Sequence, residues 1–265
     1  MSLRSTILVS ACATALGVLA GPAFADGMSD FSGVLSGGYA NYSVGGESIN
    51  SWGGDGSGMF GLGSNFAGQI DAGYHNLSAS GASIDEWDVG GSVFWRASMG
   101  RIGAVVAYDS ASGGGASGHI TSYGGFGEWF AGSMFTLGLK GGAISGSGLS
   151  GSDYFGAAAT FYAMPDLGFT GGYDYDKIGG GGGVTANTWS ITGEWLVSEH
   201  TPVSVYAGYA STDISSGGPT INTWSIGLKI YTDPEGPAPL VERQRAGAEQ
   251  WGNTTGPIGG LLSVF

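Results

Sequence analysis

Histidines are the side chains of this sequence best suited to proton transfer, and they stand at His75, His119 and His200. His75 has the neighbours that a hydrolase would use, with Asp71 four residues before it and Ser78 three residues after it. On an extended strand Asp71 and His75 share one face, whereas Ser78 points to the other. A serine hydrolase needs its serine and histidine within hydrogen-bonding reach. We therefore expect no catalytic residue and no enzyme.

Two acidic runs and one glycine run are the remaining candidates for a ligand site. Residues 85–88 (Asp-Glu-Trp-Asp) and 174–176 (Asp-Tyr-Asp) place carboxylates near predicted loop ends, where they could bind Ca²⁺ weakly. Solvated acids are the simpler interpretation, and no group of His, Asp and Glu has convincing metal-ligand spacing. Residues 179–183 are all glycine but lack the Lys-Ser/Thr that completes a phosphate-binding loop. We expect no cofactor and no metal.

The elements that would position these side chains are β-strands. In residues 187–195, Trp189, Ile191 and Trp195 fall on one face, and the alternate positions are Thr, Ser, Thr and Glu. A period of two with one apolar and one polar face is typical of a strand, and residues 222–230 nearly repeat it. The same alternation predicts twelve strands, at 31–43, 56–63, 66–78, 85–96, 101–111, 118–130, 134–145, 151–163, 167–177, 185–197, 202–212 and 220–232.

The predicted connections alternate in length along the chain. Short turns are expected at 97–100, 131–133, 164–166 and 198–201, and longer, mostly Gly/Ser-rich loops at 45–55, 79–84, 112–117, 146–150, 178–184 and 213–219. This order predicts an all-β, up-and-down antiparallel barrel of about twelve strands, with its short turns in the periplasm. An even strand count then puts both ends of the barrel in the periplasm. A soluble sandwich would need Greek-key crossings, and nothing breaks the hairpin order.

The apolar strand face predicts a lipid surrounding. Aromatic residues mark both ends of this face, at Tyr74, Tyr108, Tyr173 and Tyr209 and at Trp95, Trp129, Phe161 and Trp195. Two such groups at opposite strand ends are typical of the interfacial girdles of transmembrane barrels. A soluble barrel, the alternative, would turn its aromatics inward.

The polar strand face carries the residues that we expect to line a pore. They are Asp71, Glu86, Asp88, Arg96, Asp109, Glu128, Lys140, Asp174, Glu194 and Lys229. Unpaired charges are stable in an interior only if it is wet or if they are closely paired. Because the acids outnumber the bases, the lining would favour cations over anions.

Residues 1–25 have the pattern of a secretory signal peptide, with Arg4, an apolar run over 7–20 and Ala-Phe-Ala at 23–25. The run 9–12 superficially fits a lipoprotein cleavage box, but little apolar sequence precedes the only cysteine, Cys12. Glycine is extreme at 55 residues, yet 12% aromatic and 42% hydrophobic residues are not the composition of a disordered linker. A net charge of −13 argues against nucleic acid as a partner.

Residues 233–265 follow the last predicted strand. A Pro-rich stretch at 233–239 predicts an extended linker, and residues 240–250 predict a short polar helix. This tail could be a mobile periplasmic extension, a plug in the lumen or a contact for a partner, and we favour the mobile extension.

Residues 31–232 resemble the bacterial outer-membrane porin-like barrels, in particular the small, glycine-rich barrels of alphaproteobacteria. The repeated strand pattern carries the resemblance, with local runs such as 92–96 (Ser-Val-Phe-Trp-Arg) followed by Gly-Arg at 100–101. The family ends its last strand in an aromatic residue that the assembly machinery reads, and residues 225–231 are similar to that signal. The tail departs from the family pattern and adds a second terminal aromatic, Phe265.

The sequence as a whole predicts a barrel over 26–232 that resides in the cell outer membrane and lets small solutes or ions diffuse, with a weak preference for cations. Expected partners are outer-membrane lipid, the barrel-assembly machinery and the diffusing solutes. Two alternatives stay open: a non-conducting structural or adhesive surface barrel, and a barrel hydrolase.

Overall fold

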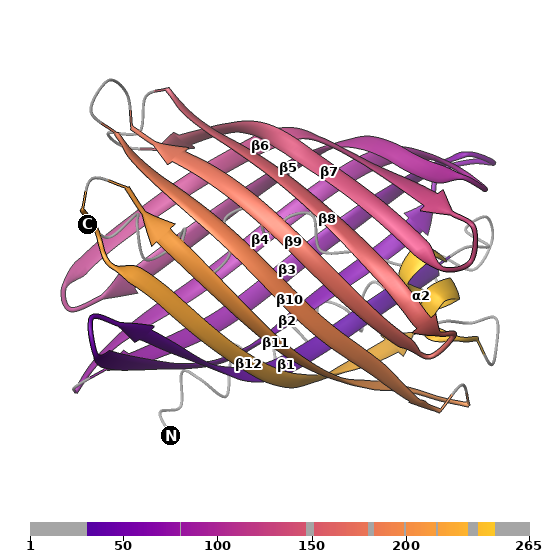
Figure 1. Cartoon of the computed structure of the whole chain (residues 1–265). Coiled ribbons are helices and arrows are strands. Elements are labelled where there is room, and N and C mark those ends of the chain that lie inside the picture. The colour runs from indigo at the N-terminus through magenta and orange to yellow at the C-terminus, as the bar shows by residue number, and fades with distance from the viewer. Residues whose placement is uncertain are drawn as a thin grey trace.

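The computed structural model of the chain describes residues 31–79, 81–146, 151–179, 183–198, 200–215, 217–232 and 238–246. Twelve antiparallel strands close into a barrel in which each strand pairs with its sequence neighbours and β1 pairs with β12 (Figure 1). The strands are β1 Phe31–Val44, β2 Glu47–Gly61, β3 Phe66–Ala79, β4 Ala82–Ala97, β5 Gly100–Gly113, β6 Ala116–Ala131, β7 Phe135–Gly146, β8 Ser152–Met164, β9 Leu167–Ile178, β10 Val184–Ser198, β11 Thr201–Ile214 and β12 Thr220–Thr232. The predicted fold and strand number are confirmed. The predicted signal peptide, residues 1–25, lies outside the described residues.

The predicted loop at 45–55 is wrong, because β2 begins at Glu47 and takes in most of it. The connection between β1 and β2 is only Gly45 and Gly46, whose φ angles of 58° and 91° suit a tight turn that few other residues could form. The error has a compositional cause. Glycine and serine in residues 45–55 indicated a loop, whereas here they belong to a strand that packs against β1 and β3 along its length.

The predicted alternation of long and short connections is also wrong at three of the six predicted long loops. At the end of the barrel where β1 meets β2, the connections at 45–46, 80–81 and 114–115 are as short as the turns at the other end. Residues 147–151, 179–183 and 215–219 form the longer connections there. Connection length therefore distinguishes the two ends of the barrel only from β7 onward, and the meander is established by the strand pairing.

Tyrosines on the inner wall explain part of the glycine within strands. A Cβ atom built at Gly38 of β1 or at Gly227 of β12 would lie 2.5 Å from the hydroxyl of Tyr206. In the same way, a Cβ atom at Gly124 of β6 would lie 2.5 Å from the hydroxyl of Tyr154. These glycines leave room for a tyrosine side chain to lie close against neighbouring strands.

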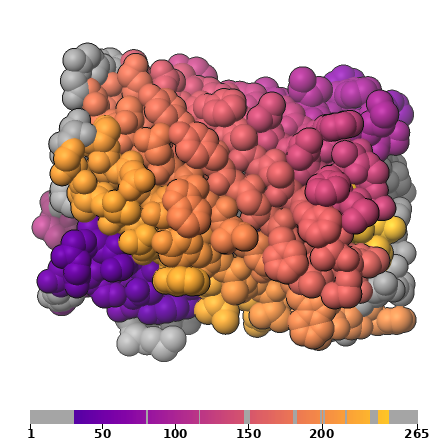
Figure 2. Space-filling view, in the orientation of Figure 1, coloured from indigo at the N-terminus to yellow at the C-terminus, as the bar shows by residue number. Residues whose placement is uncertain are grey.

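The outer face of the barrel is apolar, as predicted. Its exposed side chains include Ile70, Trp87, Val93, Trp95, Val106, Tyr123, Trp129, Leu139, Phe155, Tyr173, Trp189, Ile191, Trp195, Trp224, Ile226 and Leu228. Figure 2 shows part of this face as a continuous surface of packed side chains. A closed barrel with such a surface satisfies its backbone internally and presents mainly apolar side chains outward, which is what a bilayer requires.

The two aromatic girdles also lie where the sequence predicts them. Near one end of the barrel, the outward Tyr74, Tyr173 and Tyr209 each donate a hydrogen bond to an Asp or Asn side chain of the next strand, at 2.7–2.8 Å. Trp95, Trp129 and Trp195 lie near the other end of the barrel, among the last few residues of β4, β6 and β10. Aromatic rings with a polar atom suit the boundary between lipid and water.

One end of the interior is apolar, which the sequence did not predict. Buried Val34, Met59, Ala67, Phe94, Val105, Phe126, Leu196 and Tyr231 form a cluster there together with Leu240. Leu240 begins a short helix, α2 (Leu240–Ala246), which lies in this end of the barrel (Figure 1). The predicted helix is confirmed over these residues, but the favoured mobile extension is wrong for them because α2 packs inside. None of the helices in the described part of the chain has the length and apolarity needed to cross a bilayer.

The assignment of the outer face predicts the effect of a charge in its middle. Ile191 lies halfway along β10 and is exposed on this face. In phospholipid vesicles, Ile191→Arg should lower the free energy of unfolding by about 2–4 kcal/mol relative to Ile191→Ala, because the arginine must be held near the bilayer midplane. Urea titration of the two variants measures the difference. Equal stability of the two variants would contradict the assignment of β10.

Candidate functional site: the charged inner wall

The residues predicted to line a pore all lie on the inward strand face, opposite the exposed apolar side chains. Asp71, Glu86, Asp88, Asp109 and Glu194 are buried there, as is the side chain of Glu128, and Arg96, Lys140, Asp174 and Lys229 are half-buried. Alternation along the strands, which needs no tertiary information, was sufficient to place them. What the sequence could not give is which of these charges are paired.

Ion pairs occupy the wall formed by β5 to β12. Arg101 of β5 pairs with Glu128 of β6, and the two side chains are almost fully buried. Lys140 of β7 lies 3.0 Å from Asp174 of β9, and this pair is partly exposed to the lumen. Arg101, Lys140 and Lys229 each have an acidic neighbour, so the positive charges of this wall are balanced.

Glu194 of β10 is the most highly bonded acid of this wall. Lys229 donates to its Oε2 at 2.7 Å, Ser204 donates to Oε1 at 2.6 Å, and Tyr231 also donates to Oε1. Gln244 of α2 adds a hydrogen bond to Oε2 at 3.1 Å. Glu194 thus joins three strands of the wall to the helix inside the barrel.

The wall formed by β2 to β5 is different, because its acids lack comparable partners. Asp71 accepts hydrogen bonds from Ser57 at 2.6 Å and from Gln69 at 2.7 Å, but only through Oδ1. Within the described ranges, no protein donor reaches Asp71 Oδ2, Glu86 Oε2, Asp88 Oδ2 or either carboxylate oxygen of Asp109. We call these four residues the acidic wall. Negative charge in the lumen is therefore concentrated on one side.

Three inward charged residues were missed by the sequence analysis as lining residues. Asp55 was placed in the predicted loop at 45–55, although it faces inward from β2. Arg101 has the same strand parity as Asp109, and Asp176 the same parity as Asp174, so alternation could have found both. Only Asp55 required the structure, since nothing local indicated that its glycine-rich segment was a strand.

The helix α2 is held in its end of the barrel by polar contacts as well as by Leu240. Tyr162 donates a hydrogen bond to the side-chain oxygen of Gln244 at 2.8 Å. Arg245 donates to the backbone oxygens of Gly132 and Phe135, at 2.7 and 2.8 Å. These contacts join α2 to the wall from β6 to β8, next to the Glu194 contact on β10.

His75 does not form the arrangement of a serine hydrolase. Its Nε2 lies 2.9 Å from Asp55 Oδ1, on the inner face. The hydroxyl of Ser78 instead donates a hydrogen bond to the backbone oxygen of Asn50 at 3.4 Å, and Ser78 belongs to the opposite strand face. The predicted separation of Ser78 from His75 is confirmed.

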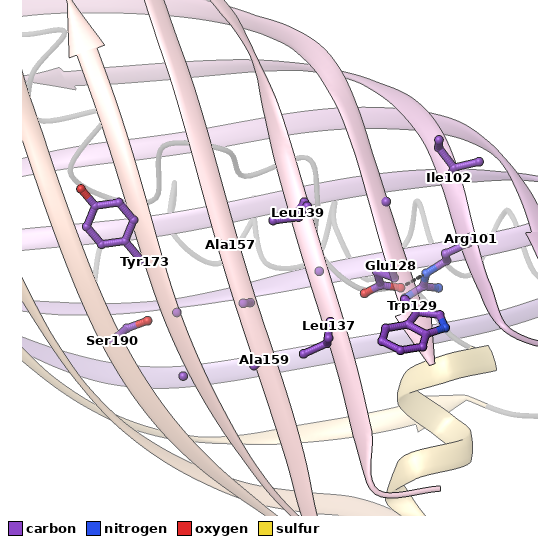
Figure 3. A pocket seen from close by; sticks show the side chains of 15 residues that line it. Arg101, Ile102, Glu128, Trp129, Leu137, Leu139, Ala157, Ala159, Tyr173 and Ser190 are labelled. Carbon is purple, nitrogen blue, oxygen red and sulfur yellow. Dashed lines mark hydrogen bonds and ion pairs between the residues drawn. The ribbon is translucent and has the colours of Figure 1, made fainter. Parts of the chain in front are cut away.

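A shallow hollow over β5 to β10 lies apart from the acidic wall (Figure 3). Exposed Trp129 and Tyr173 flank small residues such as Ala157, which leave the surface low between them. Most of its lining is apolar and outward-facing, although it also borders Arg101 and Glu128, whose side chains are on the inward face. An apolar hollow of this kind belongs to the lipid-facing surface, so the polar site of the molecule is the lumen.

Comparison with known proteins gives a fold but no family. No protein-family model matches the chain, and no curated protein matches its sequence. Among solved structures, an outer-membrane channel from Pseudomonas putida F1 has a TM-score of 0.57 at 12% identity, covering 76% of this chain and 95% of the other. The translocator domain of the autotransporter NalP from Neisseria meningitidis has a TM-score of 0.50 at 11% identity, covering 84% and 97%. The KdgM porin has a TM-score of 0.48 at 9% identity, covering 74% and 98%.

The likenesses to the Pseudomonas putida F1 channel and to the NalP translocator domain show that the chain has the fold of outer-membrane barrels. They agree with the apolar outer face and the aromatic girdles, which fit a lipid bilayer and not an aqueous surrounding. The protein is therefore an outer-membrane β-barrel.

The contacts of Glu194 predict that its charge contributes to stability. Glu194→Gln should lower the free energy of unfolding by about 1.5–3 kcal/mol, because several hydrogen bonds to a charged acceptor are weakened and Lys229 loses its counter-charge. Asp174→Asn is the matched control and should change it by only about 0–1 kcal/mol, since the Lys140–Asp174 pair is partly exposed. Chemical denaturation in vesicles checks both. Similar losses in the two variants would show that Glu194 has no special role.

Proposed function

We propose that this barrel is a passive outer-membrane channel for small solutes or ions, with a weak preference for cations. The observation that carries the proposal is the distribution of charge in the lumen: buried carboxylate oxygens on β3 to β5 that no protein donor in the described residues reaches, and ion pairs on β5 to β12. A mobile cation gains attraction from the acidic wall and meets little repulsion from the paired bases. An anion is repelled by the acidic wall and gains little attraction from bases that are already paired.

The number of strands in the barrel supports a narrow channel. Barrels of eight strands are filled by their own side chains, and barrels of sixteen or more leave a wide aqueous channel. Twelve strands lie between these limits, so the lumen depends on its side chains and on α2 for its effective width. The channel from Pseudomonas putida F1 shares this fold, and its description as a channel is in line with the proposal.

We further propose that α2 narrows one end of the lumen. Its Leu240 is fully buried in the apolar cluster, and its Gln244 hydrogen-bonds to Tyr162 and Glu194 on the inner wall. In this proposal the α2 end faces the periplasm, because β1 begins and β12 ends there. Tyr231 at the end of β12 would then be the aromatic that the assembly machinery reads.

The acidic wall predicts the selectivity of the channel. In a planar bilayer with a KCl gradient, the reversal potential of the native protein should favour potassium. The double variant Asp88→Asn/Asp109→Asn should shift it toward chloride, because it removes two carboxylates with buried oxygens that no protein donor in the described residues reaches. A matched control is Asp174→Asn, which removes a charge that Lys140 already balances.

Two outcomes would contradict this proposal. A native reversal potential that favours chloride would exclude the acidic wall as the selectivity element. Complete absence of single-channel current from folded protein would instead support a non-conducting surface barrel.

The position of α2 predicts a conductance increase when the helix leaves the lumen. Leu240→Asp should expel α2, since a carboxylate cannot be held in the apolar cluster without a partner. Deletion of 233–265 should give the same larger single-channel conductance. Glu242→Gln, at an exposed position of α2, is the control and should leave conductance unchanged. If Leu240→Asp and the deletion of 233–265 both keep the native conductance, α2 does not narrow the lumen.

A further inference from the structure

One part of the lumen wall places an imidazole and two carboxylates together. Asp55 of β2 and Asp88 of β4 both lie opposite Gly73 of the intervening β3, in a single row across three strands. His75 is two residues beyond Gly73 and so has the same inward orientation. One ligand atom from each of Asp55, His75 and Asp88 lies within 4.8 Å of the other two.

Two glycines create the space in which these groups meet. A Cβ atom at Gly73 would lie 2.1 Å from Asp88 Oδ2 and 2.7 Å from Asp55 Oδ1, so any side chain there would displace both carboxylates. A Cβ atom at Gly53 would lie 2.3 Å from Nδ1 of the His75 ring. The two carboxylates therefore converge over Gly73 because that position has no side chain.

The carboxylate of Asp88 is the group whose surroundings indicate a bound ligand. Its residue is 6% exposed, and across the described residues no protein donor reaches its Oδ2. Asp55, by contrast, accepts a hydrogen bond from Ser36 at 3.1 Å and contacts His75 at 2.9 Å. A buried carboxylate oxygen without a donor, aimed at an imidazole and a second carboxylate, is poorly satisfied by the protein and suits a cation.

The ligand types narrow the choice of cation. One imidazole nitrogen with carboxylate oxygens suits Zn²⁺ and related transition-metal ions, whereas Ca²⁺ prefers an all-oxygen set. Two ligands at about 2.0–2.2 Å from one ion are at most about 4.4 Å apart, so the three side chains need only a small adjustment. Asp109 lies opposite Asp88, and Glu86 lies opposite His75, so both add negative charge beside the ligands.

We propose that Asp55, His75 and Asp88 form a binding site for a divalent transition-metal ion of the Zn²⁺ class on the lumen wall. The site goes beyond the channel function and does not depend on conduction. Asp55 and Asp88 supply oxygen ligands, His75 supplies a nitrogen ligand, and Gly73 provides the space for them. The charge of the ion would be balanced by the two carboxylates and by the adjoining acidic wall.

The test is Zn²⁺ binding to the folded, untagged barrel in detergent, measured by isothermal titration calorimetry. The native protein should show one saturable site. His75→Gln and Asp88→Asn should each weaken it by at least about tenfold, because each removes a ligand and even a change in the outer shell of a metal site costs about 10–100-fold in affinity. Gly73→Ala should also weaken it, without any change of charge, because the methyl group occupies the space of the ligand oxygens.

Matched controls separate a defined site from general attraction to acids. Asp109→Asn removes a charge next to Asp88 without removing a ligand, so its loss should be clearly smaller than that of Asp88→Asn. Gly171→Ala adds a methyl group where no atom lies within 4 Å and should leave binding unchanged. Heat-dependent migration on gels confirms that each variant is folded.

Three results would overturn the proposal. The first is the absence of saturable Zn²⁺ binding to the native barrel, and the second is native-like affinity in folded His75→Gln. The third is an equal loss in Asp109→Asn and Asp88→Asn, which would indicate diffuse attraction. A Co²⁺-substituted sample gives an independent readout, since its visible absorption should depend on His75.

Discussion

Closure of the sheet is the constraint on which the rest of this structure depends. β1 and β12 pair in register from Gly33–Thr232 to Val44–Ile221, which leaves neither strand with an open edge. In a bilayer each unpaired backbone group is strongly destabilising, so only a closed sheet can span it. Closure also fixes the two faces of every strand, because side chains alternate between a wall that contacts lipid and a wall that encloses the lumen.

The chemistry of the lumen follows from these fixed faces. A charge on an inward position cannot rotate out to bulk water, so it must find a partner on a neighbouring strand or remain in the enclosed space. Glu194 finds partners on β11, β12 and α2, and Glu128 finds Arg101. Of the inward bases described on β3 to β5, Arg96 and Arg101 lie opposite each other next to the connection between β4 and β5, and Arg101 pairs with Glu128. His75 is the base that lies among the acids, and this asymmetry of pairing gives the lumen its acidic side.

Much of this could be predicted from the sequence because alternation is a local signal. The apolar face of β10 and the inward orientation of Asp71, Asp88 and Glu194 required only a period of two. Asp55 could not be predicted, because glycine and serine around it have the composition of a loop and become a strand only through pairing with β1 and β3. The docking of α2 could not be predicted from the sequence either, since the partners of Leu240 come from many strands and meet only in the folded barrel.

Glycine connects these points. In an open sheet, glycine within strands weakens pairing and leaves space that nothing fills. In this closed wall the space is used from within: the ring of Tyr206 lies over Gly38 and Gly227, and the carboxylates of Asp55 and Asp88 meet over Gly73. Glycine gives residues 45–55 the composition of a loop. The same residue type allows a narrow barrel to hold large rings and converging charges on its inner wall.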